Sequence, residues 1–580
     1  MQETLCPSDA IQWLKLGKEK WNEWVNQNNH WSVEFDGIDF EMEYFFSDEV
    51  SFEGLLFPTG RISFRNVNFG KKIVNFNNTK INARLIDFSG AKFGSKSSTF
   101  ISIQWKADNI RFENATFGDG SVSFAKAYFD SCIVSFIGTR FSDTEVSFVD
   151  SRFCAGSSTH PPVYSFSNSI FGTGMVNFSG TRFENGAAKF TEVTFEGNGL
   201  KFDSVYFGGE STFLGAYFDC NYVQFTDVHF RAEAAFRKSV FKCDFVNFSR
   251  STFGDADIDF SDSVIAASFH FFACEIGSGD VSFSYIDFCG SKIVFSKTNF
   301  GDGNVYFNGA RFGGRAFQCE NAKFGSGNVS FSHVFFAGDV SFRNATCKGS
   351  LSFQPDYILN ANSISFYGVE VDGELAFSEF ETACVIDLRH SKLSRTVDID
   401  CMNVNYQKVK AFPESDLLTF KKSVKPETST CYRRLKKLAK DADDHDSALE
   451  FFANEKRSNY WRGLKGYWLA FYLAYDFLSD YGRSFGRPFI ALFWLWLVFS
   501  CMYWIAGDAF TMSNIGPALL YSGSHTIPIY FGARAAKQDS LDALYCDPPM
   551  WLHGVGILQE ILCGLMLFLL ALALRNRAKT

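Results

Sequence analysis

Phenylalanine recurs at alternating intervals of five and seven residues through the first two-thirds of the chain. From Phe45 to Phe153 the alternation runs without a slip for nine periods of 12 residues, and only Ile81 and Trp105 replace phenylalanine. A globular core does not require constant spacing. A stack of equivalent coils does, because each buried ring must lie above its counterpart in the preceding coil. The sequence therefore predicts a solenoid.

The pattern continues beyond an insertion of six residues around Cys154–Thr159. It loses one residue at Phe213 and another at Phe236, weakens after Phe353, and has Phe366 and Phe377 as its last clear members. A small or β-branched residue stands two positions before most of the phenylalanines, as at Val122, Ala127, Val134, Thr139, Val146 and Ser151. This alternation predicts very short strands with one inward face, and the glycine- and aspartate-rich segments between them predict turns.

The repeated [Ala/Val/Ser/Thr]-x-Phe unit resembles the pentapeptide-repeat family, in an aromatic variant with two extra residues in alternate turns. The resemblance extends from Phe35 to Phe377. It implies a mainly β fold, a right-handed quadrilateral β-helix whose phenylalanines fill the interior, and we assign residues 31–400 to it. Two periods per coil would give about fourteen coils and a length of roughly 65–70 Å. The seven-residue steps exceed the five-residue sides of the family, which leaves the cross-section open.

The first 30 residues predict a capping helix. Ser8 and Asp9 are favourable helix-start residues, and Ile11, Leu14 and Trp21 begin an apolar stripe that continues to Val25. The stretch Trp21–Trp24 is similar to the leader of many pentapeptide-repeat proteins. A helix here would cover the open edge of the first coil. The acidic N-terminus without an apolar run does not have the pattern of a signal peptide.

The net charge and the spacing of the cysteines exclude some classes of function. The net charge is −9, and residues 31–400 carry about −13. Basic residues interrupt the acidic surface that a DNA mimic needs, so we expect no nucleic-acid partner; examples are Arg61, Arg65, Lys71, Lys72 and Arg84. The 15 cysteines are at least 15 positions apart, which excludes the usual zinc spacings and favours a reducing compartment. No catalytic or nucleotide-binding motif is present, so we expect neither an enzyme nor a cofactor nor a metal site.

After Asp400 the phenylalanine pattern ends and helical patterns begin. Residues 401–460 read as a linker and a helical hairpin, the hairpin extending from Thr428 to Tyr460. This hairpin is similar to one tetratricopeptide unit, which implies a docking or oligomerisation module; the alternative is a spacer. Residues 461–487 are rich in tryptophan and tyrosine, but their longest uncharged stretch is too short to span a bilayer, so they predict an interfacial amphipathic helix.

Residues 488–580 predict two transmembrane helices with an intervening pore loop. Pro488–Ala506 carries no charge over 19 residues, and the second span extends from about Gly554 to Leu574. Basic residues flank the outer ends of this pair at Arg483, Arg487, Arg575, Arg577 and Lys579. The positive-inside rule then predicts a multi-pass protein of the cell (inner) membrane, with both termini and the solenoid in the cytoplasm. The alternative is a buried hairpin of a soluble protein.

The segment between the two spans resembles the pore region of two-helix potassium-channel-like proteins. A short apolar helix beginning at Pro517 is followed by a threonine and an aromatic-glycine end. The resemblance implies a pore loop that includes Ser522, His525, Thr526, Pro528, Tyr530 and Gly532. Pro528 stands where a potassium filter has a flexible glycine, so potassium selectivity is not predicted. An ordinary loop holding two anchors apart is the alternative.

Gln559 and Glu560 lie about two turns inside the second span. A carboxylate at that depth is costly, so we expect both side chains to face a water-filled path. A span shifted by a few residues toward the C-terminus would instead return them to the interface.

Two functions follow from these features. The first is an oligomeric ion-channel-like or pore-forming protein in which the solenoid senses or scaffolds. One chain has too few spans to enclose a path, so this function requires a homo-oligomer. The alternative is a membrane-tethered scaffold without conductance. Both have the lipid bilayer as a partner and leave the solenoid free to bind a cytoplasmic protein.

Overall fold

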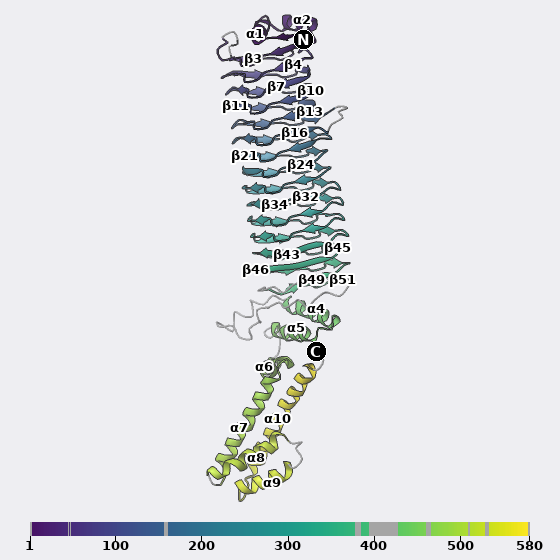
Figure 1. Cartoon of the computed structure of the whole chain (residues 1–580). Coiled ribbons are helices and arrows are strands. Elements are labelled where there is room, and N and C mark those ends of the chain that lie inside the picture. Colours follow the sequence, from purple (N-terminus) through teal and green to yellow (C-terminus); the bar gives the residue numbers. More distant parts are fainter. Residues whose placement is uncertain are drawn as a thin grey trace. The chain divides into compact units, whose positions relative to one another are not determined.

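The computed structural model describes residues 3–43, 46, 48–155, 161–377, 384–393, 427–459, 466–508, 511–527 and 533–577. The chain divides into two compact units, Met1–Tyr406 and Gln407–Thr580. The first unit is a parallel β-solenoid and the second is helical (Figure 1). The fold class predicted from the phenylalanine spacing and the apolar C-terminal segments is confirmed.

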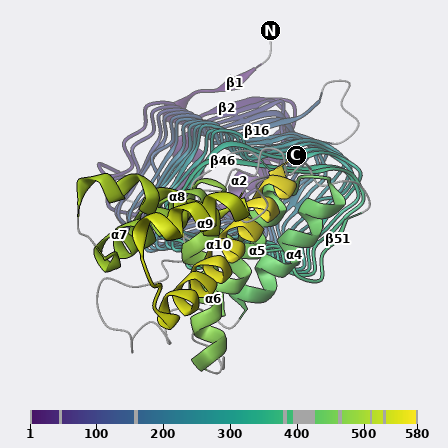
Figure 2. The same cartoon turned by 90° about the horizontal axis from the view of Figure 1, so that it is seen from below.

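The solenoid makes about 16 turns between residues 4 and 393. This exceeds the predicted fourteen, because strands lie beyond both ends of the phenylalanine pattern, from β1 (Thr4–Leu5) to β51 (Lys392–Leu393). Its described strands have two to four residues, apart from four strands of eight: β10 (Gln104–Arg111), β13 (Tyr128–Ser135), β43 (Val329–Phe336) and β46 (Leu351–Ile358). Seen along the solenoid axis, strands of successive coils overlie one another (Figure 2).

Register follows the sequence period. Trp105 of β10 pairs with Phe129 of β13, an offset of 24 residues. The offset rises to 30 where Val134 pairs with Tyr164 of β16 (Val163–Ser165), as the six-residue insertion requires. It falls to 23 where Ala188 of β20 (Ala187–Lys189) pairs with Ser211 of β24 (Ser211–Thr212), as the residue lost before Phe213 requires. Irregularities in the sequence therefore become changes of coil length, and the ladder is preserved.

The phenylalanines form several stacked columns rather than one. Phe112 stacks on Phe136 one coil later, with ring centroids 4.8 Å apart and ring planes 6° apart, and Phe124 stacks on Phe148 at 4.9 Å and 6°. Within one coil, Phe112 and Phe124 meet edge to face at 5.6 Å and 87°. Both of these contacts are favoured aromatic geometries. Phe124 and Phe136 are fully buried, as predicted, and each such ring contributes about 1.5–3 kcal/mol of apolar burial.

Tight turns explain the small residues beside the rings. Asn114 has a φ of 55°, and the Ala115 amide donates to the Phe112 carbonyl at 3.0 Å across the turn. Where the turn carries a hydroxyl residue, that side chain bonds the preceding coil: the Thr139 Oγ1 donates to the same Phe112 carbonyl at 2.7 Å. At another corner the coils approach so closely that a Cβ on Gly120 would lie 2.1 Å from the Lys96 carbonyl oxygen. At this corner no side chain fits between the coils.

The N-terminal cap is present, but it consists of two helices rather than one. Helix α1 (Pro7–Lys15) and helix α2 (Lys18–Gln27) are separated at Gly17, whose φ of 90° is incompatible with a continuous helix. Trp21 of α2 is fully buried and stacks on Phe35 of the first coil, with ring centroids 6.0 Å apart. Its Nε1 donates to the Leu56 carbonyl at 2.6 Å. The indole thus closes the open end of the aromatic core.

The second unit contains helices of very different character. Their bounds are α4 (Thr428–Asp441), α5 (His445–Ser458), α6 (Gly466–Ser479), α7 (Gly486–Ala506), α8 (Ile515–Thr526), α9 (Ala533–Leu544) and α10 (Met550–Arg577), with short 3-10 segments η1 (Asp480–Gly482) and η2 (Met512–Asn514). Helices α4 and α5 form the predicted hairpin. The aromatic helix α6 leaves Phe471 and Phe477 largely exposed.

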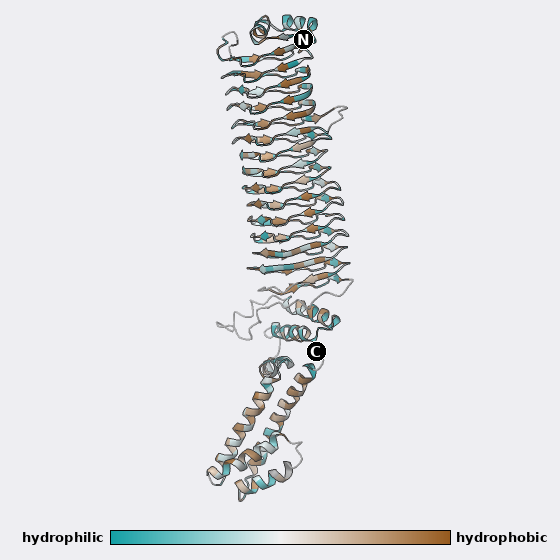
Figure 3. Ribbon diagram, in the orientation of Figure 1, coloured by the Kyte–Doolittle hydropathy of each residue, from teal (hydrophilic) through white to brown (hydrophobic). Residues whose placement is uncertain are grey.

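Helices α7 and α10 are long and apolar enough to cross a membrane (Figure 3). Only 17% and 28% of their most apolar windows are buried, whereas a core helix of a soluble protein is mostly buried. They run antiparallel: the Asn576 Nδ2 donates to the Gly482 carbonyl at 3.2 Å, and the Arg577 guanidinium lies 4.8 Å from the Phe485 ring centroid. The start of α7 and the end of α10 therefore lie side by side.

Candidate functional site between helices α7, α8 and α10

Helix α8 packs against the middle of helix α7. The Ser522 Oγ donates to the Trp496 carbonyl at 2.8 Å, and the Trp496 Nε1 donates to the Leu519 carbonyl at 3.1 Å. Trp496 stands at the centre of the 21-residue helix α7, about 15 Å from either end at 1.5 Å per residue. The C-terminal half of α8 therefore lies at mid-height of α7 rather than beyond its end.

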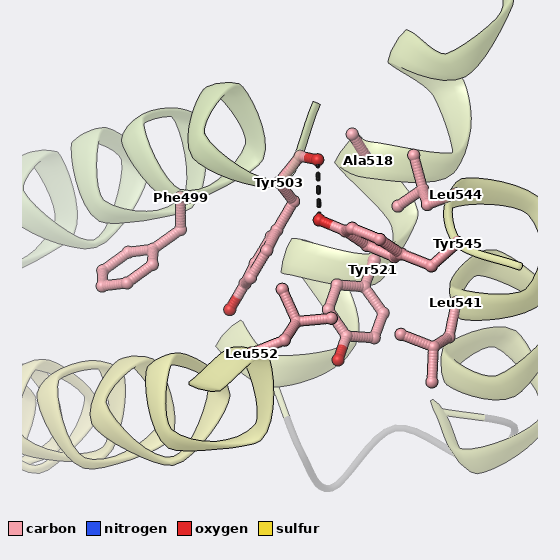
Figure 4. Close-up of a cluster of buried hydrophobic side chains, with 8 residues drawn as sticks. All are labelled: Phe499, Tyr503, Ala518, Tyr521, Leu541, Leu544, Tyr545 and Leu552. Carbon is pink, nitrogen blue, oxygen red and sulfur yellow. Dashed lines mark hydrogen bonds between the residues drawn. The ribbon is translucent and has the colours of Figure 1, made fainter. Parts of the chain in front are cut away.

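An apolar cluster holds α8 in this position (Figure 4). Its centre is Tyr503 of α7, whose ring meets Tyr521 of α8 edge to face at 4.8 Å. The Tyr545 hydroxyl donates to the Tyr503 carbonyl at 3.0 Å. The members are Phe499, Tyr503, Ala518, Tyr521, Leu541, Leu544, Tyr545 and Leu552. Because they come from α7 to α10 and the segments between, the cluster joins all four helices.

A buried polar network centres on Gln559 of α10, which is fully buried. Its Nε2 donates to the Ser522 carbonyl, the Ser522 Oγ and the Thr526 Oγ1 at 2.9, 2.8 and 3.1 Å. Its Oε1 accepts from the Tyr503 hydroxyl at 2.9 Å. Both polar ends of this buried amide are therefore hydrogen-bonded to neighbouring helices. These bonds fix one arrangement of the helices, because any shift would leave buried polar atoms unpaired.

An ion cluster lies beside this network. The Glu560 Oε1 is 2.8 Å from the His525 Nδ1 and 3.2 Å from the Lys537 Nζ. The His525 ring fits against Gly556, where a Cβ would lie 2.6 Å from its Cε1. Its buried Nε2 has no hydrogen-bond partner among the described residues. Glu560 and Lys537 remain partly exposed, at 38% and 39% of their side chains.

The structure brings together five of the residues singled out from the sequence. Ser522, His525 and Thr526 come from α8, and Gln559 and Glu560 come from α10. Gln559 faces the other helices of its own chain, whereas Glu560 is half-buried at the surface of the unit. Pro528, Tyr530 and Gly532 lie outside the described residues. A pore-lining role for any of these side chains stays a prediction.

Lys537 and Tyr503 are parts of the site that sequence reasoning missed. Lys537 lies on α9, in a segment where acidic and basic residues are interspersed and nothing marks one lysine. For Tyr503 the sequence did contain a signal. A hydroxyl within an apolar helix needs a polar partner, and Gln559 is one.

A second polar cluster joins helix α5 to the start of α7. Arg457 donates to both carboxylate oxygens of Asp476 at 3.1 and 2.6 Å and to Asp480 at 2.5 Å. Its side chain and that of Asp476 are each 10% exposed. Burial alone would lower the pKa of Arg457, but the two carboxylates raise it above its ordinary value. The Arg487 Nη1 also donates to the Asp476 carbonyl at 3.0 Å. We refer to Arg457, Asp476, Asp480 and Arg487 as the junction cluster.

The hairpin has an ion pair of its own at Glu455, whose side chain is 5% exposed. Burial alone would raise the pKa of Glu455, but hydrogen bonds from Lys436 and Arg433, at 2.6 and 3.0 Å, lower it below its ordinary value. The carboxylate therefore stays ionised and holds α4 against α5.

Over the part of the chain that the structure describes, no three His, Cys, Asp or Glu side chains gather into a metal site. Comparisons of the chain with protein-family models, curated proteins and solved structures gave no match.

Proposed function

We propose that this chain is a subunit of an oligomeric membrane pore whose helical unit spans the bilayer. The observation that carries the proposal is the position of α8. If α7 crosses the membrane, the hydrogen bonds of Ser522 and Trp496 put the C-terminal half of α8 near the bilayer centre. Backbone at that depth must be enclosed by protein or line a water-filled cavity, and a helix that enters and returns is typical of channel pores.

The charges beside α8 support the same proposal. Glu560 and Lys537 are partly exposed, and ionised side chains inside a membrane usually face a protein interior or a water path. Two spans and one re-entrant helix cannot enclose such a path, so the pore requires several copies of the chain. A tethered scaffold would need neither a helix at this depth nor charges beside it.

Topology can be tested with the chain's own cysteines. The basic ends of α7 and α10 lie side by side, which under the positive-inside rule puts them and the solenoid in the cytoplasm. Cys546, an exposed cysteine between α9 and α10, would then face outside. In intact cells a membrane-impermeant maleimide should label the wild-type chain and fail to label Cys546→Ser. Exposed Cys6 and Cys289 of the solenoid should react only after lysis. Labelling of these two in intact cells would contradict the proposed orientation.

Conductance is the decisive measurement. Purified full-length protein in lipid bilayers should show discrete current steps, and its mass in detergent should be a multiple of 65.3 kDa. Thr526→Ala should alter the steps, because it removes a hydroxyl that accepts from Gln559 and donates to the Ser522 carbonyl.

The matched control is Leu558→Met on the exposed face of α10, where Leu558 is 51% exposed; it should leave the current steps unchanged. A monomer that is silent under all voltages would overturn the pore and leave the membrane-tethered scaffold.

In this proposal the solenoid acts as a sensor or scaffold and no chemical step is catalysed. The junction cluster supports a mechanical link, because it ties the hairpin of α4 and α5 to the segment that enters the membrane. A movement of the hairpin would therefore be passed to the start of α7.

A further inference from the structure

The solenoid contains an open cavity that plays no part in the proposed pore. It has a volume of about 850 Å³ and lies on the face built by β10, β13 and β6 (Lys80–Asn82). Thr59 and Asn29 form one wall; the Thr59 amide and hydroxyl donate to the Asn29 carbonyl at 2.6 and 2.9 Å. Beneath the cavity Trp105 is fully buried, and its Nε1 donates to the Thr79 Oγ1 at 3.0 Å. The floor is therefore rigid.

The parallel register arranges the side chains of this face as a grid. Lys80, Gln104 and Tyr128 are partners on three successive coils, and Asn82, Lys106 and Asp130 are partners in the adjacent column. Coils are about 4.8 Å apart and positions two residues along a strand about 6.8 Å apart. The Cα atoms of Lys80 and Lys106 are therefore about 8 Å apart, close enough for both flexible side chains to reach one ligand group.

The charge of the cavity contrasts with that of the solenoid. Lys80, Lys106 and Lys126 line it with a single acid, Asp130, in a unit whose net charge is strongly negative. Lys106 is 3.4 Å from Asp130. Within the described residues, the ammonium groups of Lys80 and Lys126 make neither an ion pair nor a hydrogen bond. Cations left without partners in a concave site attract an anion.

The other side chains that line the cavity indicate what the ligand carries besides an anionic group. Gln104, Asn82 and Ser102 supply neutral hydrogen-bonding groups, and Tyr128, which is 38% exposed, lies at the edge of the grid. An exposed tyrosine ring next to lysines suits a ligand that joins a flat ring to an anionic group.

We propose that this cavity binds a small organic phosphate that also carries an aromatic ring. The phosphate lies between Lys80 and Lys106, where it replaces Asp130 as the partner of Lys106, and the ring lies against Tyr128. The site is independent of the pore, since all its residues belong to the solenoid. A ligand here would give the solenoid a chemical signal to sense.

The test uses full-length protein in detergent and three probes measured by isothermal titration calorimetry. Adenosine 5′-monophosphate carries both groups, ribose 5-phosphate lacks the ring, and adenosine lacks the phosphate. We expect adenosine monophosphate to bind more tightly than either partial probe. Lys80→Ala and Lys106→Ala should each weaken it about tenfold, because each removes one charged hydrogen bond. Binding should also weaken as salt is raised.

Lys292→Ala and Lys323→Ala are the matched controls, since both lysines are exposed on solenoid strands outside the cavity. They should leave the affinity unchanged, and all four variants should keep the wild-type circular dichroism spectrum. Absence of binding by all three probes, or equal weakening by the control variants, would overturn the site. Tight binding of adenosine alone would overturn the role of the phosphate.

Discussion

At the residue scale, the fold depends on which side chain occupies each inward position. Large rings alternate with small or β-branched residues because stacked rings leave room for little else between coils. Phe112 and Phe136 illustrate the large class, and the Ala115 turn position illustrates the small one. The inward positions tolerate few changes of volume, since solenoid interiors are packed as densely as other protein cores.

Phe136→Ala should lower the free energy of unfolding of the solenoid by about 3–5 kcal/mol, because it opens a cavity in the centre of the ring columns. Chemical denaturation followed by circular dichroism would measure the loss. Tyr285→Ala is the control: Tyr285 is 69% exposed, and its removal should change stability by less than about 0.5 kcal/mol. Equal effects of the two substitutions would contradict the inward position of Phe136.

At the element scale, buried charges decide how the helices of the second unit fit together. Arg457 reaches from α5 to Asp476 of α6 and Asp480 of η1, and all three side chains are mostly buried. Such a cluster adds little net stability when complete, but losing one member leaves buried charge without compensation. Its main effect is therefore to specify one arrangement of the hairpin on α6 and the start of α7.

Arg457→Met should destabilise the helical unit by about 3–5 kcal/mol, since Asp476 and Asp480 would remain buried without their cation. Thermal unfolding in detergent would show the change. Arg433→Met is the matched control, because Arg433 is 63% exposed and shares Glu455 with Lys436. This substitution should destabilise the helical unit by less than about 1 kcal/mol. If both variants melt like the wild type, the junction cluster does not hold these helices together.

The ion pair of Glu455 predicts that the hairpin loses stability in acid. Its pKa is lower in the folded chain than the ordinary value of 4.5, so its stabilisation is complete at neutral pH and is lost as pH falls below 4.5 through the folded pKa. Melting temperatures measured between about pH 7 and pH 3 should fall for the wild type. In Glu455→Gln they should be lower at pH 7 and vary less with pH.

Glu450→Gln serves as the control on the same helix, because its carboxylate is 36% exposed. It should give a pH profile parallel to that of the wild type. A wild-type profile identical to that of Glu455→Gln would show that the carboxylate contributes nothing.

At the scale of the whole molecule, the solenoid has its own core and needs no contact with the helices. Its ladder and ring columns lie within the unit Met1–Tyr406, and coil-to-coil contacts alone account for its stability. The cap of α1 and α2 protects the first edge, where an open strand would otherwise pair with other molecules.

A fragment of residues 1–425 should therefore be soluble and thermally stable, with a β-sheet circular dichroism spectrum. In the same fragment Trp21→Ala should lower the free energy of unfolding by about 3–5 kcal/mol and promote aggregation, because it removes the side chain that covers the first coil. Gel filtration and thermal melting would measure both effects. An unfolded fragment would contradict the independence of the solenoid.

The amino-acid sequence alone determined the solenoid, its inward rings and the two apolar helices, because period and hydropathy are local properties repeated along the chain. Even the irregularities were readable, since an inserted or lost residue changes a spacing before it changes a coil. Tertiary structure alone decided which polar groups meet. The contacts of Gln559 with Tyr503 and of Lys537 with Glu560, and the basic grid of Lys80 and Lys106, join residues 23 to 56 positions apart. Such pairings depend on helix packing and strand register, which no single segment encodes.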